Sequence, residues 1–230
     1  MKLLAFETAT EACSVALYID GEIFERFEIA PKQHTQLALP WAEQLLAEAD
    51  IKKSQLDAIA VGIGPGAFTG VRLAVALVQG IALALDKPVI PISSLAALAM
   101  QAADLKTEKI LAAIDARMGE IYCAQFRLSA DNLVDAVSEE IVIAPENYLP
   151  VLDASLVGVG TGFAANNSAL QNNLKSRLIA CRADALPHAS DTLKLAVRDY
   201  QLGKMIAPDH LEPAYLRNKV ALTLKEQGKS

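Results

Sequence analysis

The first third of the chain alternates between short apolar runs and polar turns. The run Lys2–Glu7 is apolar, residues 13–19 alternate loosely, and Glu22–Ile29 follows the dipeptide Asp20-Gly21. Asp-Gly is one of the strongest short-range signals for a β-hairpin. The pattern therefore predicts three strands in an antiparallel meander. Residues 35–49 follow, with apolar positions at the spacing of one helix face.

The rest of the chain predicts strands alternating with helices. We expect strands at 58–63 and 89–92, an apolar helix at 69–85, and a helix at 93–103 capped by Ser93. Near residue 109 the opening layout returns, with an apolar strand ending in an acid, a short polar turn and a returning strand. A strand then runs into a glycine turn at 156–162. Helices are predicted at 191–200 and 214–227.

Glycine is concentrated in the loop before the helix at 69–85. Gly62, Gly64, Gly66 and Gly70 surround one proline in this loop. Glycine allows a backbone or an anion to approach closely, and a helix N-terminus presents free N–H groups to an anion. The P-loop pattern does not fit, because no lysine follows the last glycine. Two interpretations stay open: a phosphate-binding loop, or a tight turn that packs the helix onto a sheet.

Composition and charge narrow the class of protein. The 230 residues are 53% hydrophobic but only 5% aromatic, so small aliphatic side chains supply a core suited to packed α/β layers. The net charge of −6 argues against a chain that grips nucleic acid by itself, since such binding relies on Lys and Arg. Cys13, Cys123 and Cys181 lack metal-like spacing, and we expect reduced, structural thiols.

Membrane and secretion signals are also weak in the sequence. The longest apolar run, at 71–85, is short for a membrane span and contains Arg72 and Gln79. The N-terminus lacks the basic-then-apolar layout of a signal peptide, because Glu7 interrupts it. We therefore expect a cytoplasmic protein without membrane contact.

Four segments, in order, resemble the motifs of one family. They are FETATEACSVAL at 6–17, GPGAFTGVR at 64–72, DARMGEIY at 115–122 and PAYLR at 213–217. Together they resemble the bacterial TsaB (YeaZ) family over nearly the whole chain. The resemblance implies an α/β, two-lobed fold of the actin, hexokinase and Hsp70 type (the ASKHA fold). Each lobe of that fold is a mixed sheet that opens with an antiparallel hairpin and is flanked by helices.

The resemblance also implies a division into lobes and a role. Residues 1–105 would form the N-terminal lobe and 106–208 the C-terminal lobe, with a C-terminal helix at about 209–230 packing back on the first lobe. The chain would be a non-catalytic scaffold subunit of the complex that forms threonylcarbamoyladenosine beside the anticodon of tRNA. It would dock the catalytic subunit TsaD through the N-terminal lobe and help recruit the ATPase TsaE. The complex would contact tRNA, and the isolated chain would form a homodimer.

No catalytic residue and no metal ligand is expected within this chain. His34, His188 and His210 are far apart in sequence, and neither His-Glu-x-x-His nor Gly-x-Ser-x-Gly occurs. The alternative function is an ATP-dependent phosphotransferase of the sugar- or acetate-kinase type. Asp115 is its nearest candidate for a base, by the pattern of the second hairpin.

The loops that would face a nucleotide cleft contain six candidate positions. Glu7 and Thr8 stand where such folds carry Asp and Gly in the first phosphate hairpin, so we expect no tightly bound cofactor and at most weak or shared ATP or ADP. The alternative is that the hydroxyl groups satisfy the backbone of their own turn. The candidate cofactor-binding residues are Thr8, Thr10, Ser14, Gly64, Gly66 and Gly70.

The helix at 69–85 is apolar almost all round, which predicts burial on nearly every side. One helix face in a two-layer lobe usually meets water, so we expect this helix to form a partner interface. The alternative is burial of the helix within its own fold. The predicted interface residues are Leu37, Trp41, Val71, Ala74, Val75, Val78 and Ala82.

Overall fold

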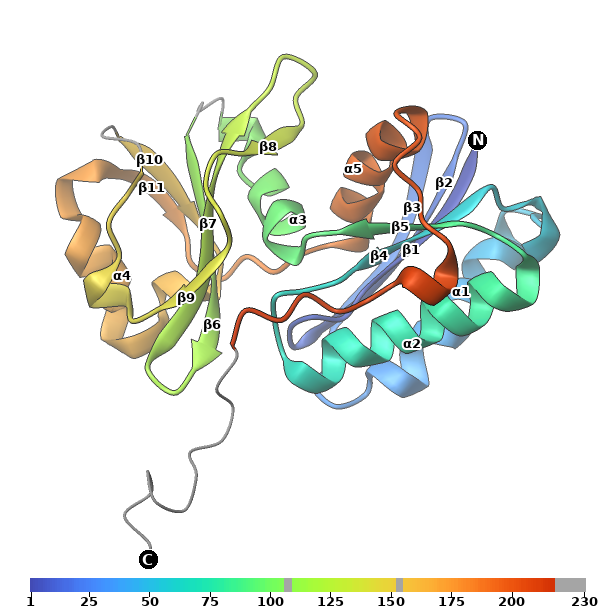
Figure 1. Ribbon diagram of the computed structural model, residues 1–230, viewed down its shortest axis with the longest axis horizontal. Coiled ribbons are helices and arrows are strands. Elements are labelled where there is room, and N and C mark those ends of the chain that lie inside the picture. Colours follow the sequence, from blue (N-terminus) through green and yellow to red (C-terminus); the bar gives the residue numbers. More distant parts are fainter. Residues whose placement is uncertain (106–108, 152–154, 218–230) are drawn as a thin grey trace, which may run out of the picture.

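Two lobes, each built on one sheet, form the molecule (Figure 1). The computed structural model describes residues 1–105, 109–151 and 155–217. The sheet of the first lobe has the strand order β3-β2-β1-β4-β5. Its strands are β1 (Lys2–Glu7), β2 (Ala12–Ile19), β3 (Glu22–Ile29), β4 (Ala58–Gly62) and β5 (Val89–Ile92).

Antiparallel pairing joins β1, β2 and β3, while β4 and β5 lie parallel to β1. The predicted meander and its Asp20-Gly21 turn are therefore confirmed. Alternate residues of β1 enter different layers, as the period of two in a strand requires. Leu4 and Phe6 pack with α1 and α2, whereas Leu3 and Ala5 face the opposite layer. The helices of this lobe are α1 (His34–Glu48) and α2 (Phe68–Leu85).

The second lobe repeats the opening of the first. Its sheet has the order β11-β10-β6-β7-β8, and β9 also pairs with β7. β6 and β7 form the antiparallel hairpin that the returning strand pattern predicted. The elements of this lobe are β6 (Ile110–Arg117), β7 (Glu120–Leu128), β8 (Val134–Ala136), β9 (Ile141–Ile143), β10 (Leu156–Val159), α4 (Ala165–Leu174) and β11 (Leu178–Arg182).

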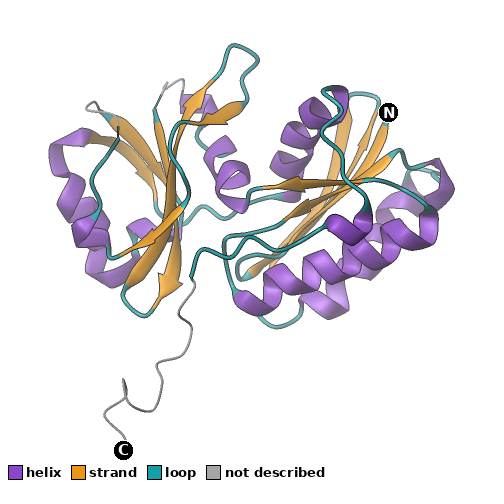
Figure 2. Cartoon of the chain, in the orientation of Figure 1, coloured by secondary structure: helices purple, strands orange, loops and turns teal. Residues whose placement is uncertain are grey.

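Two helices lie between the sheets, as the colouring by secondary structure shows (Figure 2). α3 (Ser94–Met100) begins behind Ser93, whose Oγ accepts a hydrogen bond from the Ala96 N–H, so the predicted cap is confirmed. α3 contacts β6, β7 and β8, and α5 (Ala189–Gln201) contacts α3. A continuous apolar core therefore runs from the first sheet through α3 and α5 to the second sheet.

The placement of α5 differs from the predicted division of the chain. Residues 106–208 were expected to form the second lobe, yet α5 packs against β1, β2, β4 and β5 of the first. Its amphipathic pattern predicts that one face is buried, but not which sheet buries it.

The segment after α5 also differs from prediction. Residues 211–217 are not helical, so the helix expected at 214–227 is absent over its described part, and 218–230 lie outside the described residues. We call residues 206–217 the strap. Ile206 bridges to Val89, Gln79 Nε2 donates to the carbonyls of Pro208 and Leu211, and the Ala214 N–H donates to Ile63 O. Figure 1 shows the strap passing α2 toward the second lobe.

α2 is the one helix within the described ranges that is long and apolar enough to cross a membrane by length and composition. It has 18 residues and a mean hydropathy of 1.8. It is longer than the apolar run at 71–85, because the helix begins at Phe68. One face of α2 packs against β4 and β1. Core helices of globular proteins share these properties.

Candidate functional site

A cavity of about 920 Å³ opens between the lobes, a size typical of ligand sites. Five segments and Thr161 line it: the β1–β2 turn, the turn from β3 into α1, the glycine loop with the start of α2, the β6–β7 hairpin end, and the strap. Both hairpin turns and the glycine loop therefore meet at one cleft, as the fold predicts. Thr10, Gly66 and Gly70 line the cavity, as does Asp115.

The glycines of the loop are in contact with the chain's own β1–β2 turn. A Cβ at Gly66 would lie 2.2 Å from Ala9 O, and a Cβ at Gly70 would lie 2.0 Å from Thr8 O. The Ala67 N–H donates to Ala9 O at 2.7 Å. The absence of side chains therefore lets two backbone segments touch. Of the two interpretations of this loop, the structure supports the tight turn.

The carboxyl group of Glu7 fills the space behind this turn. Oε1 accepts a hydrogen bond from the Ala9 N–H, and Oε2 accepts one from Ser94 Oγ, both at 2.8 Å. Ser94 Oγ in turn accepts from the Gly64 N–H at 3.2 Å. A Cβ at Gly62 would lie 1.9 Å from Glu7 Oε2, so this glycine makes room for the carboxyl. The network ties together the ends of β1 and β4 and the start of α3.

Burial changes the acidity of Glu7. Removal from water raises the pKa to about 6, although hydrogen bonds from Ala9 N, Ser94 Oγ and Thr8 N oppose the rise. In the sequence Glu7 occupies the position of a phosphate-hairpin Asp, but no local pattern indicates that its side chain is wholly buried. Its partner Ser94 lies 87 residues away in the chain, which no local pattern reveals.

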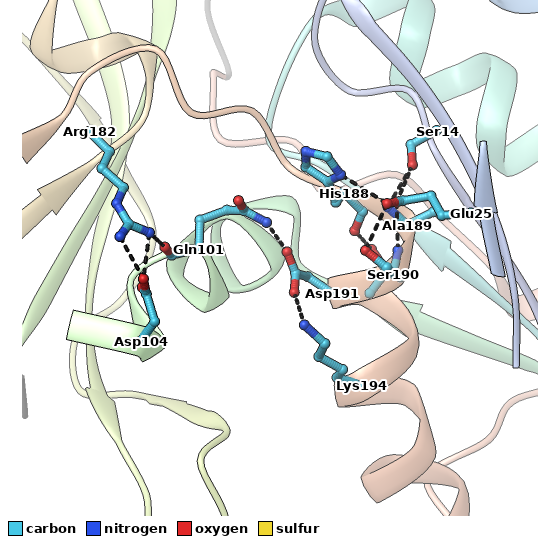
Figure 3. Close-up of polar contacts among 11 residues, drawn as sticks. Ser14, Glu25, Gln101, Asp104, Arg182, His188, Ala189, Ser190, Asp191 and Lys194 are labelled. Atoms are coloured by element: carbon cyan, nitrogen blue, oxygen red, sulfur yellow. Dashed lines mark hydrogen bonds and ion pairs between the residues drawn. The ribbon is translucent and has the colours of Figure 1, made fainter. Parts of the chain in front are cut away.

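Three of the predicted nucleotide-facing residues form hydrogen bonds within the protein. Thr8 is buried and its hydroxyl donates to Gly70 O at 2.8 Å. The Gly64 N–H donates to Ser94, as described above. Ser14 faces α5 rather than the cleft: its Oγ accepts from the Ala189 N–H at 2.9 Å and donates to Glu25 at 2.7 Å (Figure 3). The Thr8 and Ser14 hydroxyls bond distant segments of the protein, whereas the alternative interpretation placed these bonds within the turn itself.

Glu25 organises the polar cluster around Ser14. It accepts from the Ser190 N–H and lies 3.1 Å from His188 Nδ1, at the start of α5 (Figure 3). Burial raises the pKa of Glu25, but the hydrogen bonds from His188, Ser190 and Ser14 outweigh that effect and lower it. Carboxylates at a helix N-terminus are favourable, so the cluster fastens α5 to the edge of the first sheet. β3 carries no sequence motif that could have predicted this.

Aromatic and charged side chains surround the mouth of the cleft. The Arg72 guanidinium lies over the Phe68 ring at 3.1 Å and near the Tyr215 ring at 4.8 Å from the ring centroids. On the opposite lobe, Arg117 pairs with Asp115 at 2.8 Å. Asp115, the candidate base of the kinase alternative, is therefore held in an ion pair at the surface of the cleft.

The predicted interface stripe on α2 belongs to the core. Four side chains of the stripe pack with α1 and the first sheet, because Val and Ala allow a helix to approach a sheet closely, and Val71 is buried where it lines the cleft. The prediction of these residues as a partner surface was wrong, and the alternative of burial holds for them. They are Val71, Ala74, Val75, Val78 and Ala82. Leu37 and Trp41 of α1 are half-buried.

The opposite side of α2 remains open to solvent. Ala76, Gly80, Leu83 and Ala84 are exposed, and Leu73 and Leu77 are half-buried. We call these six residues the outer face of α2. A Cβ at Gly80 would meet nothing within 4 Å, so the fold itself does not require a glycine there.

The described residues show neither a grouped set of metal ligands nor a disulfide. Over residues 1–105, 109–151 and 155–217, no three His, Cys, Asp or Glu side chains are grouped to hold a metal ion. Cys13 and Cys123 are buried and Cys181 is half-buried, all three as free thiols. Burial raises the pKa of Cys13 to about 12, which suits a structural thiol. The expectation of no metal site stays a prediction.

The two sheets and the cleft define an ASKHA-type protein whose phosphate turn is filled by its own side chain and backbone. The model of the TsaD family, tRNA N6-adenosine threonylcarbamoyltransferase, matches residues 27–223. A tRNA threonylcarbamoyladenosine biosynthesis protein TsaB from Escherichia coli (strain K12) is 40% identical over 96% of both chains. The chain belongs to the TsaB family, within the wider group that this model describes.

Other relatives agree with that assignment. The TsaB protein of Haemophilus influenzae is 40% identical over 96% of this chain and 95% of its own. A solved structure described as YeaZ from Pseudomonas aeruginosa matches with a TM-score of 0.87 and 41% identity, covering 94% of this chain and 99% of that one. The predicted family and two-lobed fold are confirmed.

Proposed function

We propose that this chain is the non-catalytic scaffold subunit in the formation of threonylcarbamoyladenosine on tRNA. Relatives that are 40% identical over nearly the full length carry the name of that biosynthesis. In this role the chain docks the catalytic subunit TsaD, helps to recruit the ATPase TsaE, and performs no chemistry itself.

The filled phosphate turn is the observation that carries the non-catalytic part of the proposal. A nucleotide phosphate bound in such a fold needs free backbone N–H groups at the first hairpin and the glycine loop. Here Ala9 N is bonded to Glu7, and Ala67 N is bonded to Ala9 O. The close approach at Gly66 leaves no room for an anion between the two segments. The same contacts argue against the phosphotransferase alternative.

The outer face of α2 supports docking. A partner helix would bury the apolar surface of Leu73, Leu77 and Leu83, and apolar burial is the main driving force of association. Gly80 lies between them and permits a close helix–helix approach, which small residues allow. The half-buried Leu37 and Trp41 of α1 extend the apolar surface beside it. We therefore place TsaD on this face, with a second copy of the chain as the occupant when TsaD is absent.

A pull-down with purified TsaD tests the docking face. We expect Ala76→Glu combined with Leu83→Glu to abolish retention of TsaD, because two carboxylates would be buried without partners. Leu202→Glu is a matched control, since Leu202 is 61% exposed and Leu83 is 62% exposed, and it should bind as the unchanged chain does. Undiminished TsaD binding by the folded double variant would refute the docking face.

Transfer to unmodified tRNA tests the function itself. Threonylcarbamoyl-adenylate would be the donor, and TsaD and TsaE would be supplied with and without this chain. We expect modification only when this chain and TsaD are both present, and none from this chain alone. Equal modification without the chain would contradict the scaffold role, and micromolar binding of Mg-ATP by the isolated chain would favour the phosphotransferase.

A further inference from the structure

The mouth of the cleft has a stacked aromatic and cationic group that the scaffold role does not use. Arg72 lies over Phe68 at 3.1 Å and near Tyr215 at 4.8 Å from the ring centroids. Phe68 is 61% exposed and Tyr215 is 55% exposed, although neither ring is needed to fill the core. Aromatic residues make up only 5% of the chain, and here two exposed rings lie beside one arginine. Exposed aromatic residues and arginine are typical of binding sites.

The charges around this group are not balanced. In the part of the chain that the structure describes, no carboxylate forms an ion pair with Arg72 or with the exposed Lys32, and both line the cleft. Arg117 is paired with Asp115, but its side chain remains 79% exposed. Lys32, Arg72, Arg117 and Arg217 line the cleft against the carboxylates Glu11 and Asp115, so four cations face two anions in a chain whose net charge is −6. An anionic ligand would be attracted to this part of the molecule.

The shape of the site selects among anionic ligands. A phosphate deep in the cleft is excluded by the Ala9–Gly66 contact, so the ligand lies at the mouth. Flat rings beside cations suit nucleotides, because bases stack on aromatic side chains while Lys and Arg neutralise phosphates. An acidic peptide would use the cations but would leave the rings without stacking partners. Unpaired bases are required, since the bases of a duplex are already stacked on one another.

We propose that the cleft mouth formed by Phe68, Arg72 and Tyr215, with Lys32 and Arg117 beside it, binds unpaired nucleotides of RNA. Bases stack on Phe68 and Tyr215, and Arg72 and Lys32 contact the phosphates. This rests on the proposed function, in which the substrate is a tRNA, and it adds a direct contact to a subunit that was expected to reach tRNA only through the complex. In this proposal the net charge of −6 does not exclude contact with RNA, because the cations at the cleft mouth are grouped locally.

Fluorescence anisotropy with a labelled single-stranded oligoribonucleotide tests the site on the full chain. We expect Phe68→Ala and Tyr215→Ala each to weaken binding by about tenfold, the usual effect of losing one stacked base. Arg72→Gln should also lower the slope of log affinity against log salt by about one. Phe24→Ala and Arg127→Gln are controls of the same residue types outside the cleft, and neither should change binding.

Further arms identify the ligand. Phe68→Trp should bind the single strand better than Phe68→Ala does, because it keeps a ring for stacking. If Phe68 served only to pack against its neighbours, the larger Trp side chain would disturb that packing and would not restore binding. A duplex of the same sequence, ATP and a glutamate-rich peptide should compete poorly with the single strand. The proposal is overturned if the unchanged chain does not bind the single strand, if the cleft variants bind it normally, or if any of these competitors is equally effective.

The transfer assay separates this proposal from the scaffold role. The cleft variants should still retain TsaD and should raise the KM for tRNA more than they lower kcat. If the complex needs the chain for activity but the cleft variants leave the KM for tRNA unchanged, the RNA site is refuted and the scaffold role stands. Activity without the chain defeats the scaffold role whatever the RNA binding shows.

Discussion

Replacing Glu7 by Gln should remove one particular pH dependence from the stability of the chain. Gln has nearly the same shape as Glu and never ionises. Its Oε1 can accept from the Ala9 N–H, and its amide can donate to Ser94 Oγ, in place of the present bonds of 2.8 Å. The substitution therefore isolates the cost of carrying a charge at this buried position.

The magnitude follows from the pKa of Glu7. Burial raises it from 4.5 to about 6, and at 1.36 kcal/mol for each unit this corresponds to about 2 kcal/mol. The unfolded chain loses this proton first, so between pH 4.5 and 6 the folded state holds more protons. Stability from this group is therefore complete below pH 4.5 and is lost as the pH rises through about 6.

Urea unfolding followed by circular dichroism at several pH values between 4 and 8 would measure the effect. The quantity of interest is the difference in free energy of unfolding between the unchanged chain and Glu7→Gln, because other titrating groups cancel in it. We expect this difference to shift by about 2 kcal/mol across the window, in favour of Glu at low pH. Parallel profiles for the two proteins would refute the assignment of a buried, ionising Glu7.

Two glycines give further predictions. Gly62→Ala should destabilise the chain by about 1–3 kcal/mol through overpacking against Glu7. In a Glu7→Ala background this loss should largely disappear, which a double-mutant cycle of urea unfolding would measure. Equal losses in both backgrounds would contradict the contact between Gly62 and Glu7. Gly80→Ala should stabilise the isolated chain by about 0.5–1 kcal/mol, because the site is open and helical, and should weaken TsaD binding in a titration. Unchanged affinity of Gly80→Ala for TsaD would refute the inference that a partner helix approaches α2 closely at Gly80.

Local patterns were sufficient for most of the elements. The Asp20-Gly21 turn, the paired strands on either side of it and the Ser93 cap depend on neighbouring residues, and each is present. The structure begins α2 at Phe68, one residue before the predicted start. Element type follows from short-range periodicity, and for that reason it was predictable.

Long-range contacts account for what the sequence left undetermined. An apolar helix such as α2 shows no clear polar face, so periodicity could not tell which stripe meets the sheet. In the structure the Val75 stripe is buried and the Leu83 side is open. The pairing of Glu7 with Ser94 and of Ser14 with α5 depends on how distant elements pack. Of the candidate ligand residues, Thr10, Gly66 and Gly70 lie at the cleft, and ligand binding by them stays a prediction.

The packing of α5 on the first sheet has a consequence for synthesis. One face of β1, β2 and β4 is covered by a helix that begins at Ala189, so during translation that face stays bare until most of the chain has left the ribosome. Contacts of such long sequence separation slow folding and expose apolar surface to aggregation. A nascent chain that stops after the first lobe is therefore a natural client for chaperones, and a fragment ending near residue 105 should not fold alone.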